Sequence, residues 1–188
     1  EIAKKYDLKI IEDAAQSFGA KIGNKIVGTF GDVAATSFYP SKPLGCYGDG
    51  GAIFTDDDEL AEKCKAIRIH GTTTDKHNSE LIGLNGRLDS IQAGVLLEKL
   101  TIFEEELNLR EKISNQYRNR LKNCQHIPKN YTSSHALFSI LLESNQARKQ
   151  TMQKLQENNI PTVIYYKSPI HLMKAFSYLG YRKDNLPI

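Results

Sequence analysis

Short apolar runs, separated by glycine and turn residues, fill the first third of the chain and predict a sheet. Leu8 to Ile11 is a strand-sized apolar run, and the small residues and glycines of positions 14–32 predict a loop or short hairpin after it. Val33 to Tyr39 and Gly51 to Thr55 have the pattern of two further strands. Only about ten residues join these two, fewer than a parallel crossover requires. We therefore expect them to be antiparallel neighbours, with Pro40 to Gly50 as an exposed connection at one end of the sheet.

Helical periodicity replaces the strand pattern in the middle of the chain. Thr55-x-x-Asp58 resembles a capping box, and apolar residues then recur at helical spacing. After a polar loop, Asp89-x-x-Gln92 predicts the cap of a long second helix that continues to about Leu121. The residues expected on the buried side of that helix are Ile91, Val95, Leu96 and Leu100.

The last third of the chain alternates between strand and helix patterns. It indicates a strand from Ala136 to Leu142, a helix from about Gln146 to Asn158, a strand from Pro161 to Tyr166 and a short helix around His171 to Leu179. The alternation predicts a small α/β domain docked on the larger sheet, with the division near residues 105–125.

Composition and charge exclude several classes of function. With 40% apolar and 25% charged residues, the 188-residue chain has the composition of an ordinary globular protein. The net charge of +3 is small, and no Lys/Arg block alternates with aromatics, so we expect no nucleic-acid partner. The longest apolar runs fall far short of the roughly 20 residues that cross a bilayer, so we expect no membrane partner. The chain opens without Met and stops in a loop-like sequence, so we expect a piece of a longer protein.

The three cysteines, Cys46, Cys64 and Cys124, argue against two kinds of site. They are odd in number, widely spaced and form no C-x-x-C pair, which is typical neither of a disulfide framework nor of a zinc site. We expect no metal and a reducing, cytoplasmic location.

Three polar residues fall at predicted strand ends: Asp13, Ser37 and Lys42. Adjacent strands lie about 5 Å apart, so groups at their ends can converge on one small ligand. A carboxylate, a hydroxyl and an amine suit a ligand with a cationic ring nitrogen, a phosphate and an aldehyde, as in pyridoxal phosphate. The amine bonds to the aldehyde and moves protons, the carboxylate keeps the ring nitrogen protonated, and the hydroxyl helps to hold the phosphate.

Each of these residues also has an ordinary structural interpretation. An aspartate after a strand is often a turn residue, and a loop lysine beside prolines is often only solvated. The Gly48-Asp49-Gly50-Gly51 run lacks Walker spacing and precedes a strand, which favours a tight turn over a phosphate loop. Spacing alone therefore leaves both interpretations open.

Three ordered motifs strengthen the cofactor hypothesis. The first motif is Glu12-Asp13-Ala14-Ala15-Gln16-Ser17-Phe18-Gly19-Ala20 with Gly31-Asp32. The second motif is Ser37-Phe38-Tyr39-Pro40-Ser41-Lys42-Pro43-Leu44-Gly45 with Gly48-Asp49-Gly50-Gly51-Ala52. The third motif is Arg68-x-His70-Gly71 with Asn85-Gly86-Arg87-Leu88-Asp89-x-x-Gln92-Ala93. In order and spacing, across about residues 8 to 110, they resemble the signatures of the DegT/DnrJ/EryC1/StrS family of pyridoxal-phosphate-dependent sugar aminotransferases.

The resemblance implies a fold class and an assembly. The family has the α/β fold-type-I (aspartate aminotransferase-like) architecture and forms homodimers with the active sites at the subunit interface. Residues 1–110 would then be the C-terminal part of the large cofactor-binding domain, and residues 111–188 an incomplete small C-terminal α/β domain. The family's N-terminal part, which supplies a phosphate loop and a stacking aromatic, has no counterpart here, so we expect this piece alone to lack half of its cofactor pocket.

The resemblance also implies residue roles. Lys42 would be the catalytic residue that carries the cofactor, Asp13 the partner of its ring nitrogen, and Gln16 a neighbour of the ring near its phenolic oxygen. Ser37 would bind the phosphate, and Asn85 would reach the phosphate of the neighbouring subunit's cofactor.

Three further side chains are candidates for binding the substrate. Arg87, on the same loop as Asn85, would meet its anionic part or serve only as an ion-pair partner. His171 and His77 are candidates for the border of the sugar pocket, which the sequence does not decide, and the role of His70 also stays open.

Family members transfer the amino group of glutamate to a nucleotide-diphosphate-linked keto-sugar. The stretch from Lys42 to Thr55 resembles the branch that acts on UDP-linked 2-acetamido-3-oxo sugars in bacterial surface-polysaccharide synthesis. One alternative is a sugar dehydratase of the same fold, in which a histidine replaces the lysine at position 42. Another is a non-catalytic regulator that binds the cofactor or a sugar nucleotide.

Overall fold

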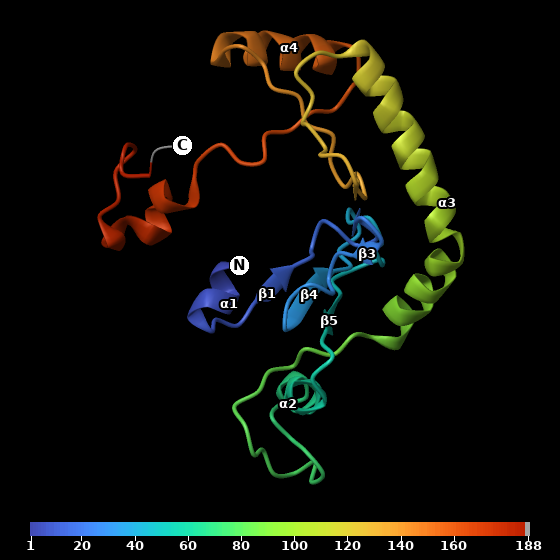
Figure 1. Ribbon diagram of the computed structural model, residues 1–188, viewed down its shortest axis with the longest axis vertical. Coiled ribbons are helices and arrows are strands. Elements are labelled where there is room, and N and C mark those ends of the chain that lie inside the picture. The colour runs from blue at the N-terminus through green and yellow to red at the C-terminus, as the bar shows by residue number, and fades with distance from the viewer. Residues whose placement is uncertain (187–188) are drawn as a thin grey trace. The chain divides into compact units, whose positions relative to one another are not determined.

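A three-stranded sheet lies at the centre of the first part of the chain. The computed structural model describes residues 1–186 and divides into two units, Glu1–Leu141 and a second that begins at Leu142. In the first unit, β1 (Ile11–Asp13), β4 (Val33–Ser37) and β5 (Gly51–Phe54) are hydrogen-bonded in the order β1-β4-β5 (Figure 1). The β1–β4 pair is parallel, and the β4–β5 pair is antiparallel, which confirms the prediction from the short connection.

The two faces of this sheet differ in burial. Side chains alternate along β4, so Ala34 and Thr36 are buried while Ala35 is exposed. Thr36 completes the buried side by donating its hydroxyl to the Ala14 carbonyl, at 3.0 Å. On the opposite face, Ile11 is 78% exposed and Ile53 is 55% exposed. The sheet is therefore covered on one face by this part of the chain.

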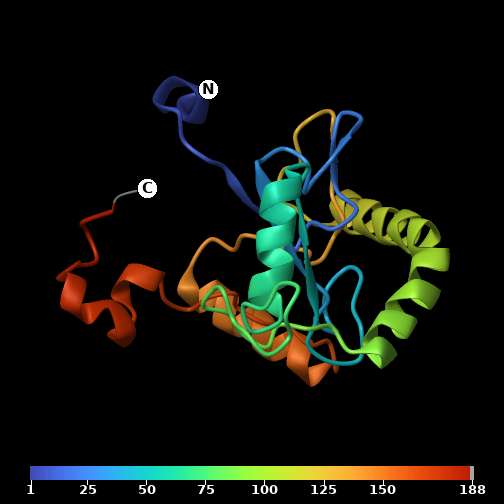
Figure 2. The same cartoon turned by 90° about the horizontal axis from the view of Figure 1, so that it is seen from below.

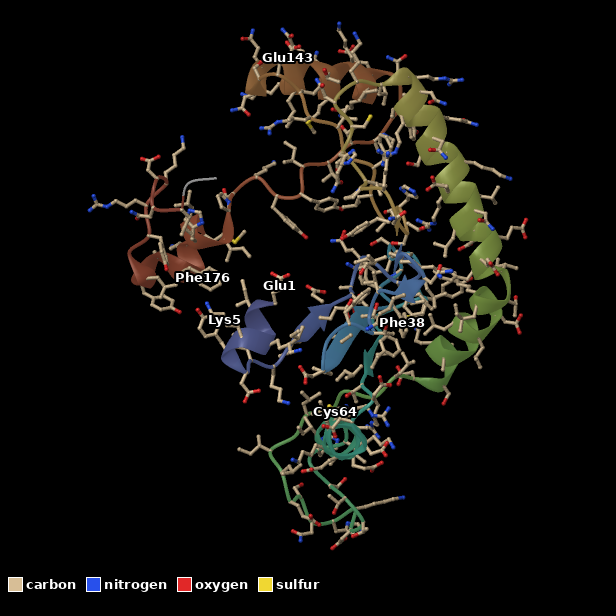
Figure 3. The ribbon with its side chains drawn as sticks, in the orientation of Figure 1. Glu1, Lys5, Phe38, Cys64, Glu143 and Phe176 are labelled. Carbon is tan, nitrogen blue, oxygen red and sulfur yellow. The ribbon has the colours of Figure 1, made fainter. Side chains whose placement is uncertain are left out.

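The 40–50 connection is partly buried, and the prediction that it is an exposed loop is wrong for its middle. Pro43, Leu44 and Cys46 are fully buried, whereas Tyr47 is 78% exposed. The apolar side chains turn inward because a helix packs against them and completes a hydrophobic core. The members of that core are Phe38, Leu44, Cys46, Leu96 and Phe103. Phe38 is labelled in Figure 3.

The first two helices are short. Helix α1 spans Ile2–Tyr6 and helix α2 spans Asp58–Arg68. The N-cap of α2 is Asp57, whose carboxylate accepts the Leu60 N–H at 2.9 Å. The expected capping box that starts at Thr55 is wrong, because the Thr55 hydroxyl accepts instead from the Asp57 N–H just before the helix.

Helix α3 is one continuous helix, Ser90–Arg120, that curves along its length (Figure 1, Figure 2). Leu96 and Phe103, two helical turns apart, define its buried stripe. Ile91 is 79% exposed and Leu100 is 45% exposed, so their predicted burial is wrong. Ile91 lies about 140° around the helix from Leu96, at 100° per residue, and so points away from the sheet. The helix passes through position 110, and the domain division proposed there stays a prediction.

A second small sheet joins distant parts of the first unit. The 14–32 segment contains the predicted short hairpin, formed by β2 (Lys21–Ile22) and β3 (Lys25–Ile26). β2 also pairs antiparallel with β6 (Tyr131–Thr132), which follows α3. The Ser134 hydroxyl reinforces this junction by donating to the Gln16 carbonyl at 3.0 Å.

The second unit contains helix α4 (Asn145–Glu157), which confirms the helix expected there, and two 3-10 segments, η1 (Ile170–Leu172) and η2 (Lys174–Leu179). Ser144 caps α4 by accepting the Ala147 N–H at 3.0 Å. The predicted strands at 136–142 and 161–166 are wrong. A strand requires a ladder partner, and within residues 1–186 the first makes only an isolated bridge from Ile140 to Cys124, while the second pairs with nothing.

Within residues 1–186, no helix is both long and apolar enough to cross a membrane.

Candidate functional site

The parallel pairing of β1 and β4 brings two predicted site residues to one edge of the sheet. Asp13 is the last residue of β1 and Ser37 the last residue of β4. Asp13 is aligned with Ala35, two residues before Ser37, so alternation places Asp13 and Ser37 on the same face of the sheet. That face is the one on which Ile11 and Ile53 are exposed. A carboxylate and a hydroxyl therefore stand together on the open face, at the end of two adjacent strands.

Backbone turns fix the chain around Asp13. Its carboxylate accepts the Ala15 N–H at 3.0 Å, an Asx turn that redirects the chain after β1. Glu12, on the other face, accepts the N–H groups of Gly28 at 2.6 Å and Phe30 at 3.0 Å. Glu12 therefore holds the glycine-rich segment in place through hydrogen bonds, and Asp13 is the exposed carboxylate of the two.

Lys42 lies in the connection just beyond Ser37. The Lys42 N–H donates to the Tyr39 carbonyl at 2.9 Å, which closes a turn. The Phe38 N–H donates to Gly50 and the Cys46 N–H to Phe38, so the connection folds back upon the end of β4. The Lys42 side chain is half-buried. The amine is thereby carried by a folded loop at the edge where Asp13 and Ser37 lie.

Gly45 makes this fold of the connection possible. A Cβ atom at position 45 would lie 2.7 Å from the carbonyl oxygens of both Tyr39 and Pro40. Both neighbours are backbone atoms that cannot rotate away, so only glycine fits.

Sequence reasoning missed two residues that hold this connection from α3. Gln92 was expected to cap the helix, but its side-chain Oε1 accepts the Tyr47 N–H at 2.7 Å. Lys99 Nζ donates to the Gly45 carbonyl at 2.6 Å. The seven-residue spacing of these two polar groups, with Leu96 between them, was the sequence signal that could have revealed them.

The other predicted residues are distributed over three places. Gln16 is exposed, three residues beyond Asp13. Asn85 and Arg87 are exposed and bonded to each other, Arg87 Nε donating to Asn85 Oδ1 at 3.0 Å. Among the hydrogen bonds of residues 1–186, none joins this loop to Asp13 or Lys42. His171 belongs to the second unit, where its ring meets Tyr181 edge-on. The roles assigned to these residues stay predictions.

The chemistry at the sheet edge is compatible with pyridoxal phosphate. Its carboxylate, hydroxyl and amine are the donor and acceptor types that a cationic ring nitrogen, a phosphate and an aldehyde require. The open face leaves Asp13 accessible to such a ring. No group of His, Cys, Asp and Glu side chains within the described part of the chain is arranged to hold a metal ion.

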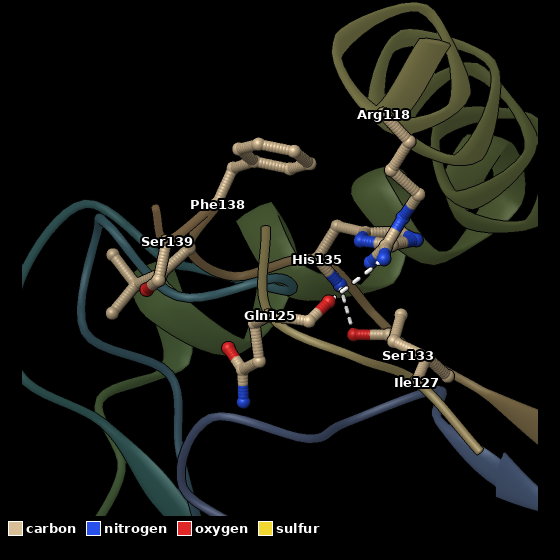
Figure 4. Close-up of a pocket in the computed structure, with 8 residues that line it drawn as sticks. Arg118, Gln125, Ile127, Ser133, His135, Phe138 and Ser139 are labelled. Carbon is tan, nitrogen blue, oxygen red and sulfur yellow. Dashed lines mark hydrogen bonds between the residues drawn. The ribbon is translucent and has the colours of Figure 1, made fainter. Parts of the chain in front are cut away.

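A small cavity of about 60 Å³ lies elsewhere in the first unit, between α3 and the 125–139 segment (Figure 4). Arg118 closes it by donating to the Gln125 carbonyl at 2.7 Å while its guanidinium lies over the Phe138 ring. Beside it, the nearly buried His135 ring is hydrogen-bonded to the Glu111 carboxylate, and this bond lowers the pKa of Glu111 below its ordinary value.

Glu111→Gln is expected to destabilise the protein near neutral pH by about 0.5–1 kcal/mol, a small value because the Glu111 side chain is 47% exposed. A carboxyl with a lowered folded-state pKa stabilises the fold above its unfolded pKa of about 4.3 and loses this effect as pH falls through the folded value. Urea midpoints of wild type and variant should therefore differ at pH 7, and the gap should narrow as pH falls below about 4.3. Glu104→Gln, on the exposed side of α3, is the control, and a gap that does not narrow over this acid range contradicts the explanation.

The chain is similar to known proteins over almost its whole length. The chain is 42% identical over 191 residues to the UDP-2-acetamido-2-deoxy-3-oxo-D-glucuronate aminotransferase of Pseudomonas aeruginosa, covering 100% of this chain and 51% of that protein. It is 40% identical over 190 residues to the pleiotropic regulatory protein of Geobacillus stearothermophilus, covering 99% and 51%. The crystal structure of Streptomyces venezuelae DesV in complex with a ketimine intermediate superposes with a TM-score of 0.92 at 34% identity, covering 99% of this chain and 50% of that one.

The chain spans about half the length of the curated relatives that it matches. Its α/β fold is part of the fold-type-I architecture of aminotransferases of this family, as the family resemblance implied. The family model described as "DegT/DnrJ/EryC1/StrS aminotransferase family" matches residues 1–188. The strand-end motifs, the fold and the family match agree, and the chain belongs to the DegT/DnrJ/EryC1/StrS aminotransferase family.

Proposed function

We propose that the native polypeptide, meaning the chain as the cell produces it, is a pyridoxal-phosphate-dependent aminotransferase. It moves an amino group from glutamate to a keto-sugar carried on a nucleotide diphosphate. The observation that supports this most directly is the placement of Asp13, Ser37 and the Lys42 loop at one edge of the sheet, in a chain of this family.

Each residue at the edge has a defined task in this proposal. The Lys42 amine would hold the cofactor covalently until the substrate amine displaces it, and the released amine would then move a proton at the reacting carbon. The Asp13 carboxylate keeps the ring nitrogen protonated by proximity of opposite charge. The Ser37 hydroxyl donates to the phosphate, and Gln16 lies against the ring. The bound cofactor supplies the electron sink that makes proton removal from carbon possible.

The finer parts of the proposal concern substrate and assembly. The Pseudomonas aeruginosa relative is named for a UDP-2-acetamido-3-oxo sugar acid, which supports a UDP-2-acetamido-3-oxo sugar as the substrate. The resemblance of residues 42–55 to the corresponding family branch is the basis for proposing a role in bacterial surface-polysaccharide synthesis. We further propose a homodimer in which Asn85 reaches the cofactor phosphate of the other subunit and Arg87 meets the anionic part of the substrate. His171 borders the sugar, and the domains divide as 1–110 and 111–188. A cytoplasmic location is supported by the free thiols of Cys46, Cys64 and Cys124.

A regulator is the second candidate function, because the Geobacillus stearothermophilus relative is named a regulatory protein. A non-catalytic regulator binds the cofactor or a sugar nucleotide without turnover. A dehydratase of the same fold is disfavoured because position 42 holds lysine in place of histidine. Measurement of turnover separates all three functions.

The test incubates the native polypeptide, loaded with pyridoxal phosphate, with glutamate and UDP-linked 3-oxo sugars. We expect stoichiometric 2-oxoglutarate and amino-sugar nucleotide. Cofactor binding without either product indicates the regulator, and loss of water from the sugar without 2-oxoglutarate indicates the dehydratase. Keto-sugar panels that differ in nucleotide and in keto position identify the substrate.

A further inference from the structure

Two side chains of α3 reach across to the backbone of the Lys42 connection. Gln92 Oε1 accepts the Tyr47 N–H at 2.7 Å, and Lys99 Nζ donates to the Gly45 carbonyl at 2.6 Å. The two bonds join residues 45 and 54 positions apart in the sequence. They therefore tie the connection to a helix that is distant from it in the sequence.

The residues that make these bonds lie on one face of the helix. At 100° per residue, Gln92, Leu96 and Lys99 fall within about 60° of one another. Leu96 is 6% exposed and belongs to the core cluster that includes Leu44 and Cys46. An apolar contact is thus flanked on both sides by a polar bond, and together they form one surface, which we name the α3 clasp (Gln92, Leu96 and Lys99).

The connection depends on this clasp because its middle is irregular. Residues 43–48 belong to no strand or helix, and among the described hydrogen bonds the Tyr47 N–H and Gly45 carbonyl have no other partner. Between them, the Cys46 thiol donates to the carbonyls of Phe38 and Gly48 at 3.0 and 3.2 Å. Backbone N–H and carbonyl groups that are not paired in a sheet need other hydrogen-bond partners when they pack against a core. The side chains of the clasp supply those partners.

We infer that Gln92 and Lys99 are positioning residues for Lys42, which hold its connection at the sheet edge where the amine must meet the cofactor. The inference rests on the function proposed above. Lys42 ends the turn that begins at Tyr39, and the two residues that the clasp holds, Gly45 and Tyr47, follow Lys42 by three and five positions. Release of Gly45 and Tyr47 therefore frees the chain on which the amine is mounted. A displacement of about 1 Å in such a group can cost up to 10²-fold in rate.

The first measurement is hydrogen exchange at the Tyr47 amide, resolved by fragmentation mass spectrometry on the native polypeptide. Gln92→Leu removes the acceptor and should accelerate exchange about tenfold, because a single hydrogen bond protects this amide. Gln92→Glu retains Oε1 and should keep the wild-type rate. Gln116→Leu, an exposed position of the same helix, is the matched control.

The second measurement is the pH titration of the visible absorbance of the cofactor bound to Lys42. Gln92→Leu and Lys99→Met should shift its midpoint by about half a unit to one unit, since a displaced amine loses part of its interaction with the ring. Both should lower kcat about tenfold with KM for glutamate unchanged. Lys99→Arg keeps a donor of similar reach and should restore the midpoint, and Lys112→Met is the exposed control.

The outcomes test the clasp and the proposed function separately. Accelerated exchange in Gln92→Leu and a shifted midpoint in both apolar variants, with the wild-type exchange rate in Gln92→Glu and the wild-type midpoint in Lys99→Arg, support the clasp. An unchanged midpoint in folded Gln92→Leu and Lys99→Met overturns it, as does accelerated exchange at Tyr47 in Gln92→Glu. A wild-type protein that acquires no visible absorbance overturns the proposed function, while the exchange rate at Tyr47 still decides whether α3 holds the connection.

Discussion

Lys42→Ala is expected to reduce amino-group transfer by at least about 10³-fold, because one side chain provides both covalent attachment and proton movement. The folded connection should survive, since the turn at this position uses the Lys42 N–H and not its side chain. The readouts are 2-oxoglutarate formation and borohydride reduction followed by mass mapping of the labelled peptide. We expect reduction to fix the cofactor at Lys42 in wild type and nowhere in the variant.

Two variants make this test specific. Lys42→Arg keeps the positive charge, but a guanidinium stays protonated in proteins and is a poor nucleophile, so it should be as inactive as alanine. Lys112→Ala removes an exposed lysine of α3 and should leave turnover at the wild-type level. Substantial turnover by Lys42→Ala, or a label on another lysine, would remove the basis of the proposed function.

Asp13→Asn is expected to lower kcat by about 10²-fold or more, with the cofactor still bound. The substitution tests the charge alone, because asparagine retains an oxygen that can accept the Ala15 N–H, as the aspartate does at 3.0 Å. The turn after β1 persists, and only the negative charge is lost. Without that charge the ring nitrogen no longer stays protonated, and proton removal from the substrate carbon slows.

The measurement compares kcat with the exchange of the substrate α-proton into solvent, which reports the affected step directly. Both should fall together in Asp13→Asn, whereas thermal stability should stay near wild type. Asp56→Asn, an exposed aspartate before α2, serves as the control for the loss of one negative charge. If Asp13→Asn turns over at the wild-type rate, another group must neutralise the ring.

Part of the site edge was predictable because it depends on local sequence. The apolar runs before Asp13 and Ser37 predict that both residues lie near strand ends, and the antiparallel β4–β5 pairing follows from loop length alone. Helix α4 was predictable for the same reason, since Ser144 and the periodicity after it are local signals. The parallel β1–β4 pairing was not predicted, because a connection as long as 14–32 allows either direction of the next strand.

Features that depend on distant partners were not predictable. Gln92 has the spacing of a cap residue, and only the approach of Tyr47 reveals its other use. The alternation at 136–142 and 161–166 is typical of strands, yet a strand also needs a neighbour, which the pattern does not contain. The burial of Leu44 depends likewise on where α3 packs.

The junction between β2 and β6 has a consequence for folding order. The Lys21–Thr132 pairing and the Ser134–Gln16 bond join segments more than a hundred residues apart in the sequence. Contacts of such separation carry a large loop-closure cost and form late. During synthesis, the contacts of Gln16 and β2 can form only after β6 and Ser134 have left the ribosome. The hairpin that follows Asp13 is therefore completed by a part of the chain that is synthesised more than a hundred residues later.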